Sequence, residues 1–490
     1  MMMPQLRLLW LLASLILPTA HAAAPEQLPP RILAALRQQG LPAGAASIVV
    51  REVTSGELML DVNPTTPRTP ASVMKLLPTY AALDMLGPAY TWKTRAWADG
   101  TISRGVLRGN LYLQGGGDPL MNIERWWRFV SDLRQTGLQR IEGDIIIDNS
   151  RFAPNTEAPG DFDNRPWRTY NVLPDALLVN LQSAEFVIRP SVTGRGVDVE
   201  VDPRPDNLVV ENRVRLVSGR CRGRARGVAI TTPSSDPGRV VITGQLSSSC
   251  GPQVTRRVIM RAPEFAYGSF LTLWKQQGGE LTGGMRRGET PKTAKLLVKH
   301  DSLTMAEIVR VTNKFSSNVM ARTLVLTLAA EKGGTPATPE TGARVISDWL
   351  QRQGLVFPDL VMGNGSGLSR EATISADNLA RLLVAAWNSR YAPEYLASLP
   401  LGGLDGTLRH RFAGLADASR VRMKTGTLNG TSSLAGYVTG ADGRTYAAAI
   451  MVNHPGAQNG PGEAVQAAVV RWVLALDSRP DRVAGAAPGD

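Results

Sequence analysis

Strand-like segments lie at both ends of this 490-residue chain, and most of the sequence lies between them. Near the start, residues 46–52 and 58–62 are apolar runs joined across Thr-Ser-Gly, which is typical of a strand hairpin. Near the end, three alternating segments are linked by Asn-Gly and Asp-Gly turns, at residues 420–428, 432–439 and 445–452. A sheet that uses both sets of strands would close one domain around an inserted region.

Helical and β-rich patterns divide the rest of the chain. Apolar residues three and four positions apart predict helices, and the last of these is expected near the end of the chain. The predicted helices cover residues 72–85, 303–330, 341–353, 375–388 and 463–476. From about residue 90 to 290, short β-like runs alternate with Gly and Pro turns. The chain is also longer than a domain with one simple hydrophobic core, so we predict two or three domains. The predicted fold class is α+β, an α/β sandwich with a large β-rich insertion.

The composition limits the chemistry that is available. Apolar residues make up 43% of the chain and charged residues only 20%, which excludes disorder as the main state. Four histidines and two cysteines leave little material for a metal site, a haem or an iron-sulfur cluster, so we expect no metal and no cofactor. The chemistry must therefore rest on Ser, Lys, Asn, Asp or Glu.

The first 22 residues have the pattern of a cleavable secretory signal peptide. Arg7 precedes the apolar run Leu8 to Leu17, and Ala20-His21-Ala22 ends the segment with small residues. An uncleaved interfacial anchor is the alternative. No later stretch reaches the roughly 18 apolar residues of a membrane-spanning helix. We expect an exported soluble protein, or one held loosely at a surface.

Export changes the interpretation of the two cysteines. Disulfides persist outside the cytoplasm, so we predict a bridge between Cys221 and Cys250, worth roughly 3 kcal/mol. Two buried free thiols are the alternative.

Basic residues outnumber acidic ones, 54 to 42, for a formal charge of +12. Six arginines without an acidic residue between them suggest an anionic partner or a solvated face. These residues are Arg213, Arg215, Arg220, Arg222, Arg224 and Arg226. No aromatic residue interleaves with them, so we expect no nucleic-acid partner. The net charge is compatible with loose association with anionic wall polymers or lipid headgroups.

Three short motifs, in a fixed order, carry the expected chemistry. The first is SxxK, with Ser72 and Lys75 one helical turn apart. The second is SxN, at Ser316 and Asn318, and the third is a KTG that begins at Lys424 on a predicted strand. This order is typical of active-site serine enzymes of the penicillin-recognising type.

The first two motifs predict a serine acylase that works without histidine. A serine hydroxyl needs a base within hydrogen-bond reach, and Lys75 serves only when its amine is neutral. Burial and the second cation Lys424 would favour the neutral amine by lowering its pKa. Ser316 would pass a proton to the leaving amine, and Asn318 would hold the substrate amide and orient Lys75 for Ser72.

The third motif predicts the substrate-binding side. Lys424 and Thr425 would bind a terminal carboxylate by charge and hydrogen bond. Gly426 would let the substrate backbone lie against the strand as an added strand. The backbone N–H groups of Ser72 and Thr427 are the expected donors to the oxyanion.

The chain resembles the low-molecular-mass class C penicillin-binding proteins, the D-alanyl-D-alanine carboxypeptidase/endopeptidases. The resemblance covers nearly all of the predicted mature chain, and its most specific feature is the separation of 244 residues between the first two motifs. It is carried by SVMK at 72–75, SSN at 316–318, KTG at 424–426, GNLYLQGGGDP at 109–119, GDIIIDNSRF at 143–152, GNGSGLSR at 363–370 and LPLGGLDGTLRHRF at 399–412.

The resemblance implies a penicillin-binding, β-lactamase-like transpeptidase domain with nested insertions. Domain I would comprise residues 23–90 and 290–490. Domain II would comprise residues 91–180 and 260–289, and domain III residues 181–259. It also implies a periplasmic enzyme that cleaves peptidoglycan stem peptides ending in D-Ala-D-Ala, and their cross-links, and that β-lactams acylate at the same serine.

Two other functions fit parts of the sequence. A β-lactamase would need a dedicated deacylating base, but position 316 is Ser and no candidate glutamate is identifiable. A non-catalytic cell-wall binding protein would rely on the basic insertion, although the presence of all the motif residues argues against a dead site.

Overall fold

A computed structural model describes residues 28–233, 236 and 238–477. The predicted signal peptide, residues 1–22, lies outside the described residues. No described helix is both long and apolar enough to cross a bilayer.

A five-stranded antiparallel sheet joins the two ends of the chain, as the sequence predicts. Its order is β18-β19-β20-β1-β2. The strands are β1 (Ala46–Glu52), β2 (Leu58–Val62), β18 (Val421–Leu428), β19 (Thr431–Thr439) and β20 (Thr445–Asn453). The central strands β19 and β20 are buried on both faces. Their apolar runs therefore require helices on both sides of the sheet.

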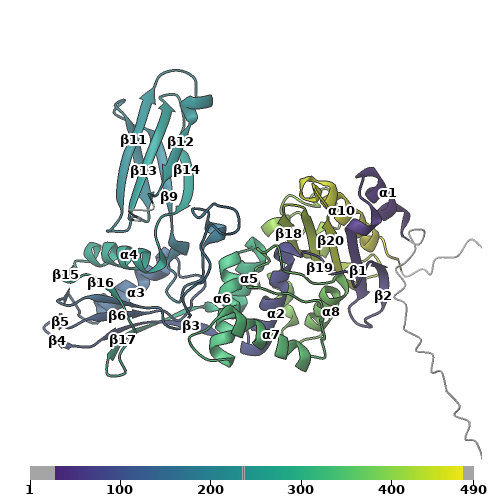
Figure 1. The fold of residues 1–490 in the computed structure, drawn as a ribbon, viewed down its shortest axis with the longest axis horizontal. Coiled ribbons are helices and arrows are strands. Elements are labelled where there is room, and N and C mark those ends of the chain that lie inside the picture. The colour runs from purple at the N-terminus through teal and green to yellow at the C-terminus, as the bar shows by residue number, and fades with distance from the viewer. Residues whose placement is uncertain (1–27, 234–235, 237, 478–490) are drawn as a thin grey trace, which may run out of the picture.

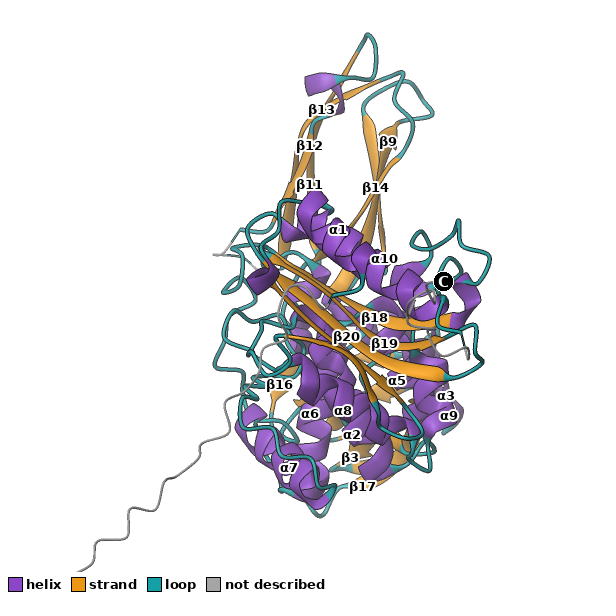
Figure 2. Ribbon diagram, turned by 90° about the vertical axis from the view of Figure 1, so that its right-hand side faces the viewer, coloured by secondary structure: helices purple, strands orange, loops and turns teal. Residues whose placement is uncertain are grey.

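Helices cover both faces of this sheet (Figure 2). On one face, α1 (Pro30–Gln38) and α10 (Pro461–Leu474) pack against side chains such as Ile48 and Ile450. On the other face lie α2 (Leu76–Leu86), α5 (Met305–Phe315), α6 (Asn318–Lys332), α7 (Pro339–Arg352), α8 (Ala376–Trp387) and α9 (Ala392–Ser398). This sandwich confirms the predicted fold class. The helical pattern predicted over 303–330 is confirmed, and the structure divides it into two helices, α5 and α6.

The inserted region begins with two further sheets and two helices. The sheets have the orders β16-β8-β6-β3-β17 and β15-β7-β5-β4. Their elements are β3 (Thr91–Ala98), β4 (Thr101–Ser103), β5 (Val106–Arg108), β6 (Leu111–Gln114), β7 (Arg140–Ile141), β8 (Ile145–Asp148), β15 (Glu280–Leu281), β16 (Met285–Arg287) and β17 (Lys295–Thr304), with α3 (Ile123–Gln135) and α4 (Ala262–Gln276). Because β17 pairs with β3, the sheet that contains β3 continues past residue 290, the position at which the sequence predicts that domain I resumes. The division into three domains stays a prediction.

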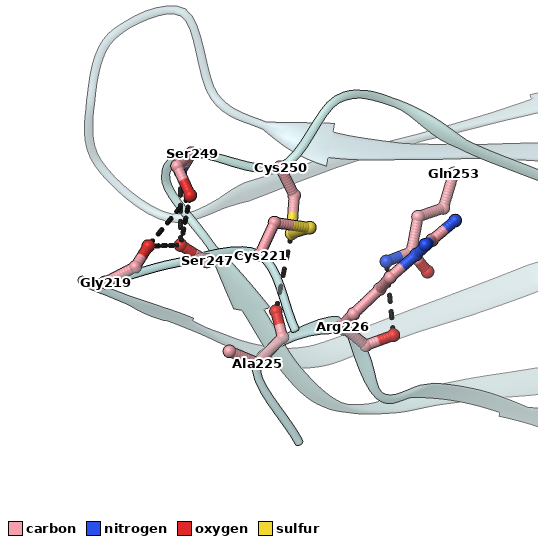
Figure 3. Close-up of a disulfide and its surroundings, with 8 residues drawn as sticks. All are labelled: Gly219, Cys221, Ala225, Arg226, Ser247, Ser249, Cys250 and Gln253. Carbon is pink, nitrogen blue, oxygen red and sulfur yellow. Dashed lines mark hydrogen bonds between the residues drawn. A yellow bond between two sulfur atoms is a disulfide. The ribbon is translucent and has the colours of Figure 1, made fainter. Parts of the chain in front are cut away.

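Residues 183–258, which we call the arm, project from α4 and the sheets beside it (Figure 1). The arm has two three-stranded sheets with the orders β10-β9-β14 and β11-β13-β12. Its strands are β9 (Ser183–Pro190), β10 (Val197–Asp202), β11 (Val209–Val217), β12 (Val228–Thr231), β13 (Arg239–Ser247) and β14 (Gln253–Val258). A disulfide joins Cys221 and Cys250, with 5.0 Å between their Cα atoms, which confirms the predicted bridge and excludes free thiols (Figure 3).

Candidate active site

The first motif lies on a tight turn at the start of α2. Ser72 and Lys75 belong to a 3₁₀ helix, Ala71–Lys75, whereas the sequence predicts an α-helix from residue 72. Residues three apart lie above one another in a 3₁₀ helix. Lys75 Nζ is accordingly 2.8 Å from Ser72 Oγ. Ala71 has a φ of 50°, so the residue before Ser72 adopts the left-handed conformation that non-glycine residues rarely occupy.

Lys75 is fully buried, and all its partners are uncharged. Its Nζ is 2.7 Å from Asn318 Oδ1 and 2.5 Å from the main-chain carbonyl oxygen of Ser366. Both oxygens only accept hydrogen bonds, so they take two N–H groups of the amine. A neutral amine has two N–H groups and one lone pair, and its lone pair is then left for the hydroxyl of Ser72. The geometry therefore fits Lys75 as a base.

Electrostatics act in the same direction. Burial lowers the pKa of Lys75 well below its usual value, and the nearby charge of Lys424 lowers it further. Burial also lowers the pKa of Lys424 to about 7. Desolvation disfavours the charged form of an amine, and a like charge adds to the effect. The site thus holds two lysines whose pKa values are both lowered, and the pKa of Lys424 lies at about 7.

A break between two helices positions the second motif. The helix α5 ends at Phe315, and Ser316 adopts a left-handed conformation with φ 59° and ψ 38°. The side chain of Ser317 then accepts a hydrogen bond from Met320 N and caps α6. In one continuous helix, Ser316 and Asn318 would point about 200° apart. Because of the break, Ser316 Oγ lies 2.7 Å from Lys424 Nζ while Asn318 contacts Lys75.

The third motif lies on β18, at the edge of the five-stranded sheet. Lys424 Nζ also donates to the carbonyl oxygen of Thr425, at 2.8 Å. A Cβ added at Gly426 would lie 2.7 Å from Pro70 O and 3.0 Å from Ser72 N. Only glycine lets the strand approach the nucleophile this closely. Thr427, the next residue, is exposed.

The loop 399–412 contacts the third motif. The sequence did not predict this contact. Thr425 Oγ1 donates to Thr407 Oγ1 at 2.8 Å. The loop is tied to the end of α5 by an ion pair between Asp405 and Lys314, 2.6 Å apart. The side chain of Lys314 is only 7% exposed, so this loop neutralises a buried charge two residues before Ser316. Asp405 Oδ1 also accepts a hydrogen bond from Leu401 N.

The inserted region contributes to the site as well. Asn318 Nδ2 donates to the main-chain carbonyl oxygen of Tyr170, at 2.9 Å, so one of its two amide hydrogens is occupied. Arg322, on α6, forms an ion pair with Glu157 at 2.8 Å. The guanidinium of Arg370 lies 5.2 Å from the ring centroid of Phe162. A segment of the insertion therefore covers one side of the candidate site.

Two of the contacts that the sequence did not predict are made by main-chain carbonyl groups. The carbonyl groups of Ser366 and Tyr170 act through the backbone, which every residue type provides. The stretch GNGSG did single out the neighbourhood of Ser366, whose hydroxyl donates to Asn364 Oδ1 at 2.7 Å. Among the described residues, no group of three or more His, Cys, Asp or Glu side chains could hold a metal ion.

A family model confirms the resemblance. The model of the D-Ala-D-Ala carboxypeptidase 3 (S13) family matches residues 30–476. The chain belongs to this family. The S13 family consists of serine peptidases, so the protein is an enzyme and a hydrolase, in agreement with the prediction from the three motifs.

Individual relatives match most of the chain. A D-alanyl-D-alanine carboxypeptidase of Actinomadura sp. (strain R39) is 28% identical over 467 residues, which cover 92% of this chain and 86% of the relative. The D-alanyl-D-alanine carboxypeptidase DacB of Haemophilus influenzae is 25% identical over 421 residues, covering 85% and 87%.

Solved structures show the same fold. Penicillin-binding protein 4 (DacB) of H. influenzae aligns with a TM-score of 0.77 at 22% identity, covering 92% of this chain and all of that one. A second structure of that protein contains a β-lactam and aligns with a TM-score of 0.74. A predatory endopeptidase of Bdellovibrio bacteriovorus aligns with a TM-score of 0.51 at 15% identity, covering 87% and 92%.

Proposed function

We propose that this carboxypeptidase removes the terminal D-Ala of peptidoglycan stem peptides through an acyl-enzyme at Ser72, and that it also hydrolyses cross-links between stem peptides. The observation that carries the proposal is the set of uncharged partners around Lys75, which leaves its lone pair for Ser72. The name of the Actinomadura relative supports the first activity. The fold shared with an endopeptidase supports the second.

Acylation uses the contacts of the first two motifs. Ser72 Oγ attacks the carbonyl carbon of the penultimate D-Ala and gives its proton to the neutral amine of Lys75. The N–H groups of Ser72 and Thr427 stabilise the oxyanion. Ser316 gives its proton to the leaving nitrogen as the C–N bond breaks, and takes a proton from Lys424, whose pKa of about 7 suits this transfer.

Deacylation reverses the proton transfers. A water molecule attacks the ester carbonyl carbon and gives one proton, through Ser316, to the neutral amine of Lys424. Lys75 returns its extra proton to Ser72 Oγ as the ester bond breaks. Both lysines then have their starting charge, and the shortened peptide and free D-Ala are the two products.

The third motif supplies substrate recognition. Before catalysis, the ammonium group of Lys424 and the hydroxyl of Thr425 bind the terminal carboxylate. The backbone of the substrate lies along the edge strand β18, where Gly426 leaves room for it. A β-lactam would enter by the same route and acylate Ser72, as the β-lactam complex of the H. influenzae relative suggests.

A fluorescent penicillin tests the acyl-enzyme. We expect a stable adduct on the peptide that contains Ser72, located by mass spectrometry, and hydrolysis of a D-Ala-D-Ala peptide by the unlabelled protein. Ser72→Ala should lose both. Full peptide hydrolysis by Ser72→Ala would overturn the proposal, and rapid release of the opened penicillin would favour a β-lactamase. A folded protein that does not react with penicillin but binds peptidoglycan saturably would favour the cell-wall binding protein.

We also propose that the protein is exported to the periplasm after cleavage at Ala22. The composition of residues 1–22 supports this location, because one positive charge, an apolar run and small residues follow in the order of a signal peptide. Cell fractionation and sequencing of the mature N-terminus provide the test. An N-terminus at Ala23 in the periplasmic fraction is expected, and an unprocessed cytoplasmic protein would refute the proposal.

A further inference from the structure

The arm carries an unusual concentration of positive charge. Residues 212–258 contain nine arginines, no lysine and one acidic residue, so this stretch accounts for +8 of the formal charge of +12 of the whole chain. Four of these arginines lie on residues 218–227, which we call the arginine turn. They are all exposed, and among the described residues none of them forms an ion pair; they are Arg220, Arg222, Arg224 and Arg226.

The arginine turn is held in place by several contacts (Figure 3). The disulfide ties Cys221 to Cys250. The carbonyl oxygen of Gly219 accepts hydrogen bonds from the hydroxyls of Ser247 and Ser249, at 2.5 and 2.8 Å. Near the other end of the turn, Gln253 Nε2 donates to the carbonyl oxygen of Arg226, at 3.2 Å. The protein therefore carries four like charges on one short turn whose backbone is already ordered, so that binding does not have to order this backbone.

The residue types select the ligand. The planar guanidinium of arginine binds phosphate through paired hydrogen bonds, which the ammonium of lysine cannot do. No aromatic residue occurs between Phe186 and Phe265, so the arm offers no platform on which bases could stack. In the turn 191–196 between β9 and β10, Val192 is 90% exposed and Arg195 is exposed as well. That turn lies at the end of the arm away from α4, because Ser183 and Val258 pair at the near end. Cationic groups beside an exposed apolar side chain suit the headgroup region of a membrane.

We infer that the arginine turn is a docking site for the phosphate groups of anionic phospholipids at a membrane surface. The arm projects away from the five-stranded sheet and the helices that carry the active site (Figure 1). Docking through the turn therefore leaves Ser72 and the edge of β18 accessible. This inference does not depend on the peptidase activity, because it uses none of the residues of the candidate active site.

Sedimentation with lipid vesicles tests the docking site. The mature protein should bind vesicles of equal parts phosphatidylglycerol and phosphatidylcholine, and salt should weaken this binding. Vesicles of phosphatidylcholine alone should not bind. In the variant R220Q/R222Q/R224Q/R226Q, the affinity for anionic vesicles should fall at least about tenfold, since each arginine near an anionic surface contributes to binding.

The control variant removes the same charge elsewhere. In R31Q/R37Q/R344Q/R352Q, four exposed arginines outside the arm are replaced, and we expect the affinity for the vesicles to stay within about threefold. The rate of labelling by fluorescent penicillin reports folding and should be the same in both variants and the wild type. Equal losses in the two variants would overturn the inference, because net charge alone would then explain binding. Tight binding to phosphatidylcholine alone would overturn it as well.

Two competitors distinguish the phosphate sources. Inorganic phosphate at the concentration of the lipid phosphate should not release the protein, because a surface engages several arginines at once. A mixed-sequence single-stranded DNA should also fail to compete. Release by either competitor at that concentration would refute the assignment to a lipid surface.

Discussion

Two groups of cations occupy opposite kinds of environment in this protein. Lys75 and Lys424 are completely buried, and burial lowers the pKa of both. The four arginines of the arginine turn are exposed, and a disulfide holds them in place. The difference shows how one charge type serves two purposes. In the two proposals above, the buried lysines exchange protons, whereas the exposed arginines act by electrostatic attraction.

Lys75→Met tests the role of the buried lysines, and we expect it to have the largest effect on the rate of acylation. The substitution removes the amine that accepts the proton of Ser72, so we expect the rate of acylation by penicillin to fall about 10²–10⁴-fold. Stopped-flow labelling measures this rate. Arg220→Gln, in the arginine turn, is the control and should label like the wild type. A Lys75→Met protein that labels normally would show that another group is the base.

Gly426→Ala tests how closely β18 must approach the nucleophile. The added methyl group would meet Pro70 O at 2.7 Å and Ser72 N at 3.0 Å, so the strand has to shift. We expect about 10²-fold slower acylation and a loss of about 1–3 kcal/mol in the free energy of unfolding. Gly44→Ala, where a Cβ meets nothing within 4 Å, is the matched control. Unchanged acylation in Gly426→Ala would contradict the close approach.

The pH dependence of kcat/KM tests the two lysines together. Activity should rise with pH as Lys75 loses its proton, because only the neutral amine is a base. Activity should fall above about pH 7 as Lys424 loses the charge that attracts the substrate carboxylate. A peptide with an amidated C-terminus should show a smaller alkaline decrease, because only the proton transfer from Lys424 to Ser316 then still requires the protonated amine. If the amide and the acid give the same profile, the charge of Lys424 does not recognise the carboxylate.

Asp405→Asn tests the loop that supports Thr425. The change removes the charge that neutralises the buried amine of Lys314, so the loop carrying Thr407 should loosen. We expect roughly tenfold slower acylation, since small displacements in an active site are costly. Asp417→Asn, which affects an exposed pair with Arg420 nearby, should leave the rate unchanged. Equal rates in the two variants would remove any positioning role from Asp405.

The double variant C221S/C250S tests whether the arm and the candidate active site are independent of each other. We expect it to have the smallest effect on catalysis. Opening a loop of 29 residues should destabilise the arm by roughly 3 kcal/mol. The rate of acylation at Ser72 should stay within about twofold, because distant sites behave independently. Limited proteolysis of the arm and penicillin labelling measure the two effects. A large loss of labelling would show that the arm and the active site are coupled.

Much of the fold could be predicted because its signals are local. The hairpin at 46–62 and the three strands from 420 to 452 follow from alternation and turn residues, and they pair as expected. The geometry of the break at Ser316 could not be predicted, because α5 and α6 have a continuous apolar pattern and a left-handed serine has no composition signal. The pairing of β17 with β3 was also missed, because pairing between distant strands depends on the packing of the whole region.

The sequence by itself determined the residue types and their order: a serine and a lysine one turn apart, an SxN and a KTG. It also determined the disulfide partners, since the chain has only two cysteines. Only the tertiary structure decided that Lys75 is buried among uncharged oxygens, that Asn318 bonds to the insertion through Tyr170, and that the arm projects away from the site. The physical reason is that a pKa and a hydrogen bond depend on what surrounds a group, and these surroundings come from segments far apart in the chain.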